Sequence, residues 1–253
     1  MMVAVDIGNS RVKWGHIRAD TVRFTAALGH DEADWTNRAA LDFAGPISWI
    51  IGSVQPEIEE RFRRWAADRG DTCRTIGRHD VPQKLDLEAP DSVGIDRLLA
   101  AFAARLRVPA DRQVIVISAG TAITVDWVDD QGTFRGGAIL PGPWLMAKAL
   151  HQYTAKLPML DVHRIGPIDA PGRCTVEAIS AGIAAACQGA CLQLIEAYTA
   201  RAGSIPVVAL AGGGFAIERI PDWLASHEVI GPHHLVLEGL GAAARHAGWL
   251  ESD

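Results

Sequence analysis

The chain has 253 residues, enough for one large domain or two modest ones, and its 49% of hydrophobic and 21% of charged residues predict a packed core. The net charge is -6 and there is no long basic run, which argues against a nucleic-acid-binding protein. Tyr and Phe are few while Ala and Gly are abundant, a composition that favours α/β layering over an aromatic-rich β-sandwich.

Apolar and alternating stretches predict a series of strands and helices in the first half of the chain. The expected strands cover residues 2–5, 11–17, 22–27 and 47–53, and the expected helices cover residues 31–43, 57–68 and 94–106.

The pattern then restarts. Strands are expected at 114–117, 122–128 and 133–140, and helices at 142–153 and 175–201. A buried strand at 206–211, a last strand at 235–237 and a closing helix at 238–246 complete the chain.

This restart indicates an internal repeat. When residues 3–10 are laid over residues 115–122, strand falls on strand and Gly8 falls on Gly120. Each half then consists of a strand, a glycine turn, two further strands and a helix. We expect the boundary between the halves near residues 108–111.

The cysteines and the apolar runs bear on the compartment. Cys187 and Cys191 lie one helical turn apart in an Ala-rich run, which is more typical of small core residues than of a metal site. Asp6 interrupts the apolar start, so no signal peptide is predicted, and no uncharged apolar run is expected to approach the ~18 residues of a membrane span. We therefore expect a cytoplasmic protein with neither a membrane nor a nucleic-acid partner.

The first candidate site follows the first strand, at Asp6, Gly8, Asn9 and Ser10. The strand brings the carboxylate to its C-terminal end, and the glycine allows a tight turn that exposes backbone N–H groups. Such a turn suits a nucleotide phosphate with Asp6 near its Mg²⁺ ion, although an ordinary β-hairpin explains the same residues.

Two further glycine turns follow later strands. The turn at Gly120 and Thr121 repeats the first one, and two such turns from related halves can hold one polyphosphate between them. Gly212, Gly213 and Gly214 would let an adenine or a ribose approach the backbone closely. Their spacing lacks the final glycine of the dinucleotide-binding fingerprint.

Asp96 and Arg97 lie in the first turn of the helix expected at 94–106. The helix dipole favours the charged form of Asp96, and a carboxylate there can accept the proton of a substrate hydroxyl in phosphoryl transfer. Arg97 can hold a carboxylate or a phosphate. Helix capping with a surface ion pair is the alternative interpretation.

Taken in order, these motifs resemble the type III pantothenate kinase family along nearly the whole chain. They keep the family's order and spacing and are jointly specific, although each alone is not. The stretches that carry the resemblance are Asp6-Ile7-Gly8-Asn9-Ser10, Gly94-Ile95-Asp96-Arg97, Gly120-Thr121-Ala122-Ile123-Thr124-Val125-Asp126, Gly136-Gly137-Ala138-Ile139-Leu140-Pro141-Gly142, Thr154-Ala155-Lys156-Leu157-Pro158 and Thr175-Val176-Glu177-Ala178-Ile179-Ser180-Ala181-Gly182.

The resemblance implies an α/β fold of the actin-like ATPase class, with two ribonuclease-H-like domains at 1–110 and 111–253 that are related by internal duplication. It implies a homodimeric enzyme that transfers the γ-phosphoryl group of ATP to pantothenate, the first step of coenzyme A synthesis. The family uses Mg²⁺ with ATP and a monovalent cation such as K⁺ or NH₄⁺.

The resemblance also implies roles for single residues. Asp96 would accept the proton, Thr121 would touch the nucleotide, and Thr175 would contact pantothenate, from its own subunit or from the partner. The ATP phosphates would be lined by Asp6, Ile7, Gly8, Asn9, Ser10, Arg11, Val12 and Lys13. Pantothenate would be bound by Leu87, Gly94, Ile95, Asp96, Arg97 and Thr175.

Two positions depart from the family pattern. Ser118 stands where the family has an aspartate that helps to hold the monovalent cation, so we expect a weakened or absent potassium requirement. Leu87 stands where the family usually has a tyrosine, which makes the fit of the substrate less certain.

Three alternatives stay open. The chain can be a catalytically silent relative that acts as a regulatory or accessory protein, which Ser118 favours. It can be a kinase of the same fold for another substrate, which Leu87 allows. A nicotinamide-dependent oxidoreductase is disfavoured because the glycine spacing is wrong.

Overall fold

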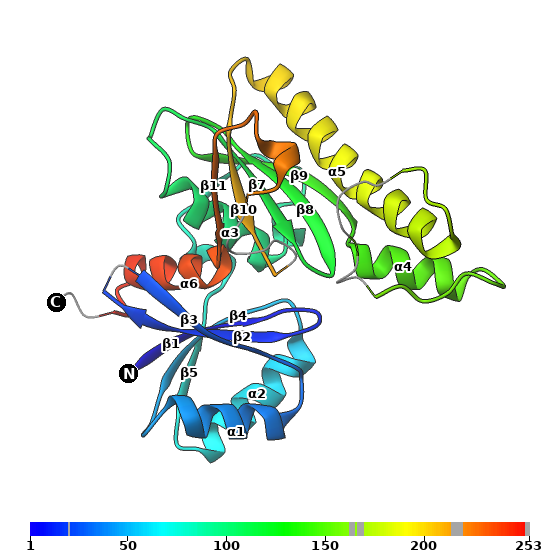
Figure 1. The fold of residues 1–253 in the computed structure, drawn as a ribbon. Coiled ribbons are helices and arrows are strands. Elements are labelled where there is room, and N and C mark those ends of the chain that lie inside the picture. The colour runs from blue at the N-terminus through cyan, green and yellow to red at the C-terminus, as the bar shows by residue number, and fades with distance from the viewer. Residues whose placement is uncertain (20, 162–164, 166–169, 214–219, 251–253) are drawn as a thin grey trace. The chain divides into compact units, whose positions relative to one another are not determined.

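The computed structural model describes residues 1–19, 21–161, 165, 170–213 and 220–250, and it divides into two compact units (Figure 1). The first unit is made of Met1–Asp111, Gln131–Arg135 and His234–Asp253, and the second of Arg112–Asp130 and Gly136–His233. This division differs from the expected halves at 1–110 and 111–253, because the closing helix of the chain packs on the sheet of the first unit.

The sheet of the first unit has five strands in the order β3-β2-β1-β4-β5. The first three strands form an antiparallel meander, and β1, β4 and β5 run parallel to one another. Their bounds are β1 (Met2–Ile7), β2 (Val12–Arg18), β3 (Thr21–Leu28), β4 (Ser48–Ser53) and β5 (Thr72–Thr75). The edge strand β5 was not predicted from the sequence, because it has only four residues and none of them is fully buried.

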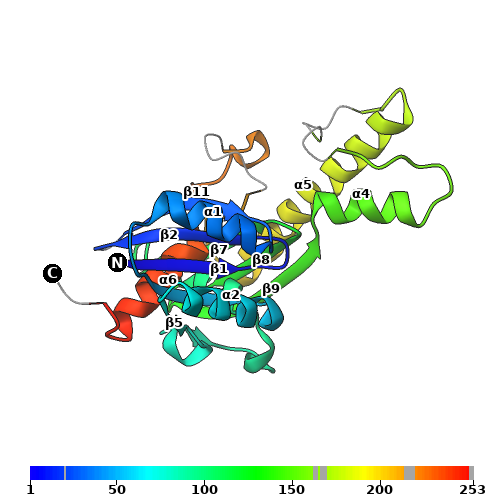
Figure 2. The same cartoon turned by 90° about the horizontal axis from the view of Figure 1, so that it is seen from below.

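Two pairs of helices cover the two faces of this sheet. Figures 1 and 2 show α1 (Glu32–Asp42) and α2 (Pro56–Asp68) on one face. Helices α3 (Ile95–Arg105) and α6 (Leu235–His246) pack against each other on the other face. Alternate residues of β1 therefore serve two cores: Val5 faces the first helix pair and Ala4 the second.

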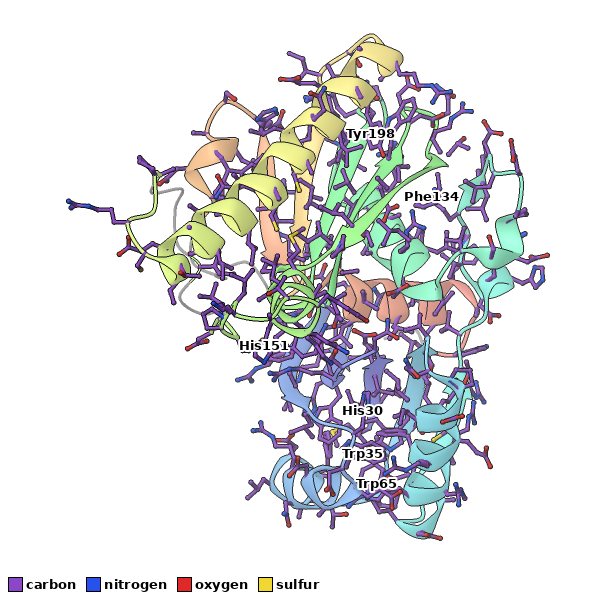
Figure 3. All side chains as sticks on the ribbon, turned by 90° about the vertical axis from the view of Figure 1, so that its right-hand side faces the viewer. His30, Trp35, Trp65, Phe134, His151 and Tyr198 are labelled. Atoms are coloured by element: carbon purple, nitrogen blue, oxygen red, sulfur yellow. The ribbon has the colours of Figure 1, made fainter. Side chains whose placement is uncertain are left out.

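Aromatic rings fill the core under α1 and α2. Trp35 and Trp65 point from these helices toward the sheet (Figure 3), and their rings lie 5.8 Å apart. The other large rings of this cluster are Trp14, Phe43, Trp49 and Phe62. Because six Trp and Phe residues gather here, this unit has an aromatic core in spite of the low overall aromatic content.

The strand expected at 235–237 is wrong, since these residues form the first turn of α6. Leu237, Leu240 and Ala244 recur every three to four residues and are buried together, which is the spacing of a helix face. The real last strand is β11 (Val229–His233). It was missed because Gly231, with φ +100°, and the proline beside it are typical of a loop.

The sheet of the second unit repeats the topology of the first. Its strands follow the order β11-β10-β7-β8-β9, so that the first strand of each unit lies between the second and the fourth. The bounds are β7 (Val114–Ala119), β8 (Ala122–Val128), β9 (Thr133–Pro141) and β10 (Val207–Ala211). The short β6 (Lys84–Leu85) pairs with the first residues of β9, which belong to the first unit.

Helix α5 (Thr175–Ala202) covers one face of this second sheet and also packs against α4 (Pro143–Gln152). In the part of the chain that the structure describes, single-turn 3-10 helices lie in the connections at Arg78–Asp80, Pro90–Ser92 and Asp222–Leu224. Cys191 and Cys187 lie in the core between α5 and the sheet, which confirms them as small core residues. Burial raises the pKa of Cys191 to about 12.

Helix α5 corrects the expectation about apolar runs. By length and composition it could cross a membrane, and only 28% of its most apolar window is buried in the structure. One such helix is weak evidence of a membrane span, because core helices pass the same test. Many of its exposed residues are small, namely Ala178, Gly182, Ala185, Ala186, Gly189, Ala197 and Ala200, although Glu177, Gln193, Glu196 and Arg201 are exposed as well.

Candidate functional site

Asp6 is the buried carboxylate at the C-terminal end of β1. It lies on the sheet face that α3 and α6 cover, and it is 5% exposed. Its neighbours in the sheet are Lys13 on β2 and Gly52 on β4, both directly opposite it in register. The Lys13 ammonium lies 3.5 Å from Asp6 Oδ2, so this buried carboxylate has a cation beside it.

The electrostatics of Asp6 follow from this position. Burial raises the pKa of Asp6 above its ordinary value, the charge of Lys13 opposes that rise, and the charge of Asp96 adds to it. Asp6 and Asp96 are therefore close enough for their charges to interact, and Lys13 partly offsets the rise in the pKa of Asp6. A site of this kind is ready to receive a cation.

The turn after β1 has the tight geometry that the sequence predicts. The Gly8 N–H donates to the carbonyl of Arg11 over 3.0 Å, which leaves Asn9 and Ser10 at the exposed tip of a hairpin. Ile7 and Val12 on either side are fully buried in the sheet. The backbone N–H groups at the tip of the turn can thus face an anion, while the two buried strand ends hold the turn in place.

Two side chains from elsewhere hold this turn. His30 follows β3, and its Nε2 lies 3.1 Å from the Gly8 carbonyl oxygen. Gln55 follows β4, and its Nε2 donates to Asn9 Oδ1 over 2.6 Å. Neither contact was predicted from the sequence. His30 is 22 positions from Gly8 and Gln55 is 46 positions from Asn9, and no local pattern connects residues so far apart.

Asp96 lies in the first turn of α3, as predicted, and Gly94 precedes the helix as its N-cap. Asp96 Oδ1 accepts the backbone N–H of Arg97 over 2.9 Å. A Cβ atom on Gly94 would lie 2.5 Å from the same oxygen, so a side chain there would displace the carboxylate. The Arg97 guanidinium lies 5.8 Å from the centre of the Phe134 ring.

A cavity of about 450 Å³ opens beside this helix start, within the first unit. Its rim carries the ion pair of Arg78 with Asp91, at 3.2 Å. Its lining consists of Ser53, Val54, Ile76, Gly77, Arg78, Asp91, Ser92, Val93, Gly94 and Ile95. Gly94 and Ile95 are predicted substrate residues, whereas Leu87, half-buried after β6, lies outside this lining.

In the second unit, the turn at Gly120 and Thr121 packs against the start of α4. The Thr121 carbonyl accepts the Gly142 N–H over 3.0 Å, and a Cβ atom on Gly142 would lie 2.4 Å from the Gly120 oxygen. Only glycine therefore lets the N-terminus of α4 approach this turn.

The glycines after β10 come to the same end of β7. Gly212 has φ +90°, and a Cβ atom there would lie 2.1 Å from the Ala119 oxygen. Gly213 is exposed with open space around it, and Gly214 lies outside the described residues. The predicted second and third glycine turns thus meet at the C-terminal end of β7.

Ser118 lies on β7 directly opposite Thr124 of β8, on the sheet face that α5 does not cover. Among the described residues, the Thr124 hydroxyl oxygen is the one buried side-chain N or O atom without a hydrogen-bond partner. Buried hydroxyls are normally paired, so this orphan oxygen next to Ser118 is an oxygen donor that a water molecule or an ion would satisfy. The two hydroxyls are neutral oxygen donors.

Thr175 is the first residue of α5 and is exposed. No side chain caps this helix end, although Glu177 accepts the Arg173 N–H over 2.6 Å. The N-terminus of a helix favours an anion, and the contact of Thr175 with pantothenate stays a prediction.

The predicted residues thus fall into two groups. The structure brings Asp6, Lys13, the turn at 8–10 and Asp96 together within the first unit, while Ser118, Thr121 and Thr175 belong to the second. In the part of the chain that the structure describes, no group of three or more His, Cys, Asp or Glu side chains is placed to hold a metal ion.

Comparison with known proteins gives one consistent family. A family model described as type III pantothenate kinase matches residues 2–197. A protein named type III pantothenate kinase from Dechloromonas aromatica is 32% identical over 248 residues, which cover 95% of this chain and 97% of that protein. One of the same name from Alkalilimnicola ehrlichii is 34% identical over 253 residues, covering 96% and 98%.

Solved structures add the fold. A protein of Sinorhizobium meliloti, provisionally assigned as a 2-dehydro-3-deoxygalactonokinase, superimposes with a TM-score of 0.56 at 15% identity, covering 98% of this chain and 99% of that one. A protein of Listeria monocytogenes, provisionally assigned as an N-acetylmannosamine kinase, gives 0.51 at 14% identity, with 97% of each chain covered. The two sheets therefore form an actin-like ATPase fold, as the sequence predicts.

Proposed function

Since the chain belongs to the type III pantothenate kinase family, we propose that it transfers the γ-phosphoryl group of ATP to pantothenate and produces 4′-phosphopantothenate. The chain is an ATP-dependent kinase, and kinases of this family use ATP with a divalent metal. The observation that carries the proposal is the pair of carboxylates, Asp6 and Asp96, which act on each other within one unit beside a glycine turn.

The proposed chemistry assigns nucleotide binding and proton acceptance to different residues. The backbone of the turn at 8–10 and the Lys13 ammonium hold the ATP phosphates, and Thr121 contacts the nucleotide. Asp96 takes the proton from the primary hydroxyl of pantothenate as that oxygen attacks the γ-phosphorus atom. Most of the rate then comes from positioning and charge stabilisation, because this transition state needs little covalent help.

The carboxylates fit a Mg²⁺ ion by their chemistry, because Mg²⁺ prefers oxygen donors and binds through one or two carboxylates and the phosphates. Asp6 is the residue that would hold it, and the rise in its pKa is what a nearby cation would reverse. When bound, the ion neutralises the charge of the phosphates.

Pantothenate recognition is proposed for Gly94, Ile95, Asp96 and Arg97, with Leu87 nearby in the chain. Arg97 supplies a guanidinium that can bind the pantothenate carboxylate, and Thr175 adds a hydroxyl at an uncapped helix start. The cavity beside Gly94 and Ile95 supports this placement, because it gives the substrate room at the start of α3.

A weakened potassium requirement is proposed for the position of Ser118. The hydroxyls of Ser118 and Thr124 are oxygen donors that suit K⁺ or NH₄⁺, yet they carry no negative charge. A cation held there by neutral oxygens alone is bound less tightly than one beside an aspartate.

A homodimer is proposed to cover the exposed face of α5. A helix of small residues lets another helix approach closely, and the most apolar window of α5 is 28% buried in the single chain. A second copy would bury this face without a membrane, which agrees with the proposed cytoplasmic location.

The test is ADP release from purified protein given ATP, Mg²⁺ and K⁺, with and without pantothenate. We expect release that depends on pantothenate and is lost in Asp96→Asn. Normal ATP binding without any release would contradict the proposal.

A second candidate is a silent relative that binds the ligands and acts as a regulatory protein. Ser118 is the observation that favours it, because the family's cation-binding charge is missing. This candidate predicts thermal stabilisation by ATP with no ADP release, and the same assay separates it from the kinase.

A further inference from the structure

We infer that His30 and Gln55 are positioning residues for the phosphate-binding turn at Gly8 and Asn9, an inference that rests on the proposed function. Neither belongs to the residues from Asp6 to Lys13 that the resemblance assigns to the ATP phosphates. They come from two separate loops, one after β3 and one after β4, and each makes a hydrogen bond to the turn.

The His30 contact orients one peptide group. A carbonyl oxygen only accepts, so His30 Nε2 carries the proton and donates it to the Gly8 oxygen over 3.1 Å. The C=O and N–H of a trans peptide point in opposite directions in one plane. By holding the Gly8 carbonyl, His30 therefore makes the Asn9 N–H point away from the His30 ring. This N–H takes no part in the hairpin hydrogen bond, which the Gly8 N–H donates to Arg11.

The Gln55 contact fixes the side chain at the tip. Gln55 Nε2 donates to Asn9 Oδ1 over 2.6 Å, which leaves the Asn9 NH₂ group as a second donor for an anion. Gln55 is itself held, because Ser53 Oγ accepts its backbone N–H over 3.1 Å and donates to its carbonyl oxygen over 3.2 Å.

The loop that carries His30 is anchored from two helices. Arg61 of α2 donates to the His30 carbonyl over 3.1 Å and pairs with Glu32 at 3.2 Å. Its guanidinium lies 5.8 Å from the centre of the Trp35 ring, and Trp35 Nε1 donates to the Gly29 carbonyl over 2.8 Å. Figure 3 shows His30 next to Trp35 in the first unit. These contacts fix the backbone at residues 29 and 30 and thereby position the ring of His30.

This arrangement matters because Asn9 and Ser10 are exposed at the tip of the turn. A tip without side contacts would have to be ordered when ATP binds, and that ordering would weaken the binding. Contacts made before the ligand arrives remove this cost. The gain concerns the nucleotide and not pantothenate, which gives the inference a selective readout.

The test uses the full chain with His30→Phe, which keeps a ring and removes the donor, and Gln55→Met, which keeps the length and removes the amide. We expect each to raise the KM for ATP and the Kd for a non-hydrolysable ATP analogue with Mg²⁺ about 3–10-fold, the loss expected for one hydrogen bond. The KM for pantothenate should stay unchanged. His30→Gln, whose amide can donate, should recover part of the loss.

The matched control is His246→Phe, which changes an exposed histidine at the end of α6 in the same unit. Its affinity for the analogue should equal that of the wild type. Wild-type affinity in both His30→Phe and Gln55→Met would overturn the inference, and so would an equal loss for ATP and pantothenate. If one variant fails to fold, the other still decides.

Analogue binding needs no pantothenate, so the two proposals fail separately. A wild type that binds the analogue but never phosphorylates pantothenate overturns the proposed function alone. In that case a weakened analogue affinity in the variants still supports the role of His30 and Gln55.

Discussion

Single residues of the first unit show how two carboxylates acquire different properties. Asp6 is buried between β2 and β4 with a raised pKa, whereas Asp96 is half-buried in the first turn of α3. The buried Asp6 with its raised pKa gains from a cation, while Asp96 lies at the helix start beside the cavity at Gly94 and Ile95. Their surroundings therefore suggest which one acts as the base.

Replacing Asp96 by asparagine tests this assignment. Asp96→Asn keeps the shape of the side chain and removes the proton acceptor, so turnover should fall by a factor on the order of 10²–10⁴. The affinity for ATP should stay close to that of the wild type. Steady-state ADP release with pantothenate measures the turnover, and calorimetry measures the affinity for ATP. A variant with wild-type turnover would show that another group is the base.

Asp6 should lower the stability of the free protein in a pH-dependent way. Its pKa is higher in the folded than in the unfolded chain, so the folded state binds the proton more tightly. Stability therefore falls as the pH rises from the ordinary aspartate pKa of 3.8 through the raised pKa of the folded state, and the full cost is present above it.

Asp6→Asn removes this cost. In the absence of ligands the variant should melt ~2–4 °C above the wild type at pH 7, and the difference should shrink toward pH 4. Thermal unfolding followed by tryptophan fluorescence measures both. An unchanged or lower melting temperature at pH 7 would mean that the pairing with Lys13 outweighs the burial of Asp6.

Ser118 should make the enzyme nearly indifferent to potassium. The wild type should keep most of its activity when K⁺ is replaced by Na⁺, because two neutral hydroxyls hold a cation weakly. Ser118→Asp should gain a dependence on K⁺, and K⁺ should raise its melting temperature more than that of the wild type. Negligible wild-type activity without K⁺ and a steep rise on its addition would contradict this prediction.

At the scale of elements, glycines set how closely the layers approach. Gly52 of β4 lies beside Asp6, and a Cβ atom there would meet Leu99 and Leu240 at 3.0 Å. Gly239 of α6 is tighter, since its Cβ atom would lie 2.2 Å from the Leu99 carbonyl oxygen. The crossing of α3 and α6 thus depends on a missing side chain, and α3 carries Asp96.

Gly239→Ala should force these helices apart and destabilise the fold by about 1–3 kcal/mol. Chemical denaturation measures the loss. Gly45→Ala is the control, because nothing lies within 4 Å of its Cβ position, and it should change the stability by less than about 0.5 kcal/mol. Equal effects of the two substitutions would mean that α3 and α6 can adjust their distance freely.

At the scale of the whole molecule, the exposed face of α5 is the feature that a single chain leaves unexplained. Small side chains recur along the exposed side of its 28 residues, and Gln193 and Glu196 are the polar residues exposed in its second half before Arg201. An isolated chain would expose this surface to water, at a cost that grows with its area. Pairing with a second copy is the proposed solution.

Sedimentation of the wild type should therefore give twice the mass of the chain. Ala185→Arg places a charge in the middle of the exposed face and should yield monomers. Leu41→Arg is the control, since Leu41 is 82% exposed on α1 and its replacement should leave the dimer intact. A monomeric wild type at micromolar concentration would exclude this interface.

Sequence alone determined the local features, because they depend on neighbours in the chain. Alternation and helical periodicity predicted most strands and helices, and the glycine turn after β1 lies where the spacing predicts it. The resemblance, read from six short stretches, identified the family that the comparisons show. The short strands β5 and β11 were not predicted. β5 has only four residues and β11 contains a Gly-Pro pair, so neither shows a clear alternating pattern.

Only the tertiary structure decided which distant residues meet. Helix α6 packs on the first sheet although it follows the last strand of the second, because its buried face matches α3 and β1. His30 reaches Gly8 across 22 residues, and Thr124 faces Ser118 through strand register. These contacts depend on chain topology and packing, and the local sequence pattern carries no information about either.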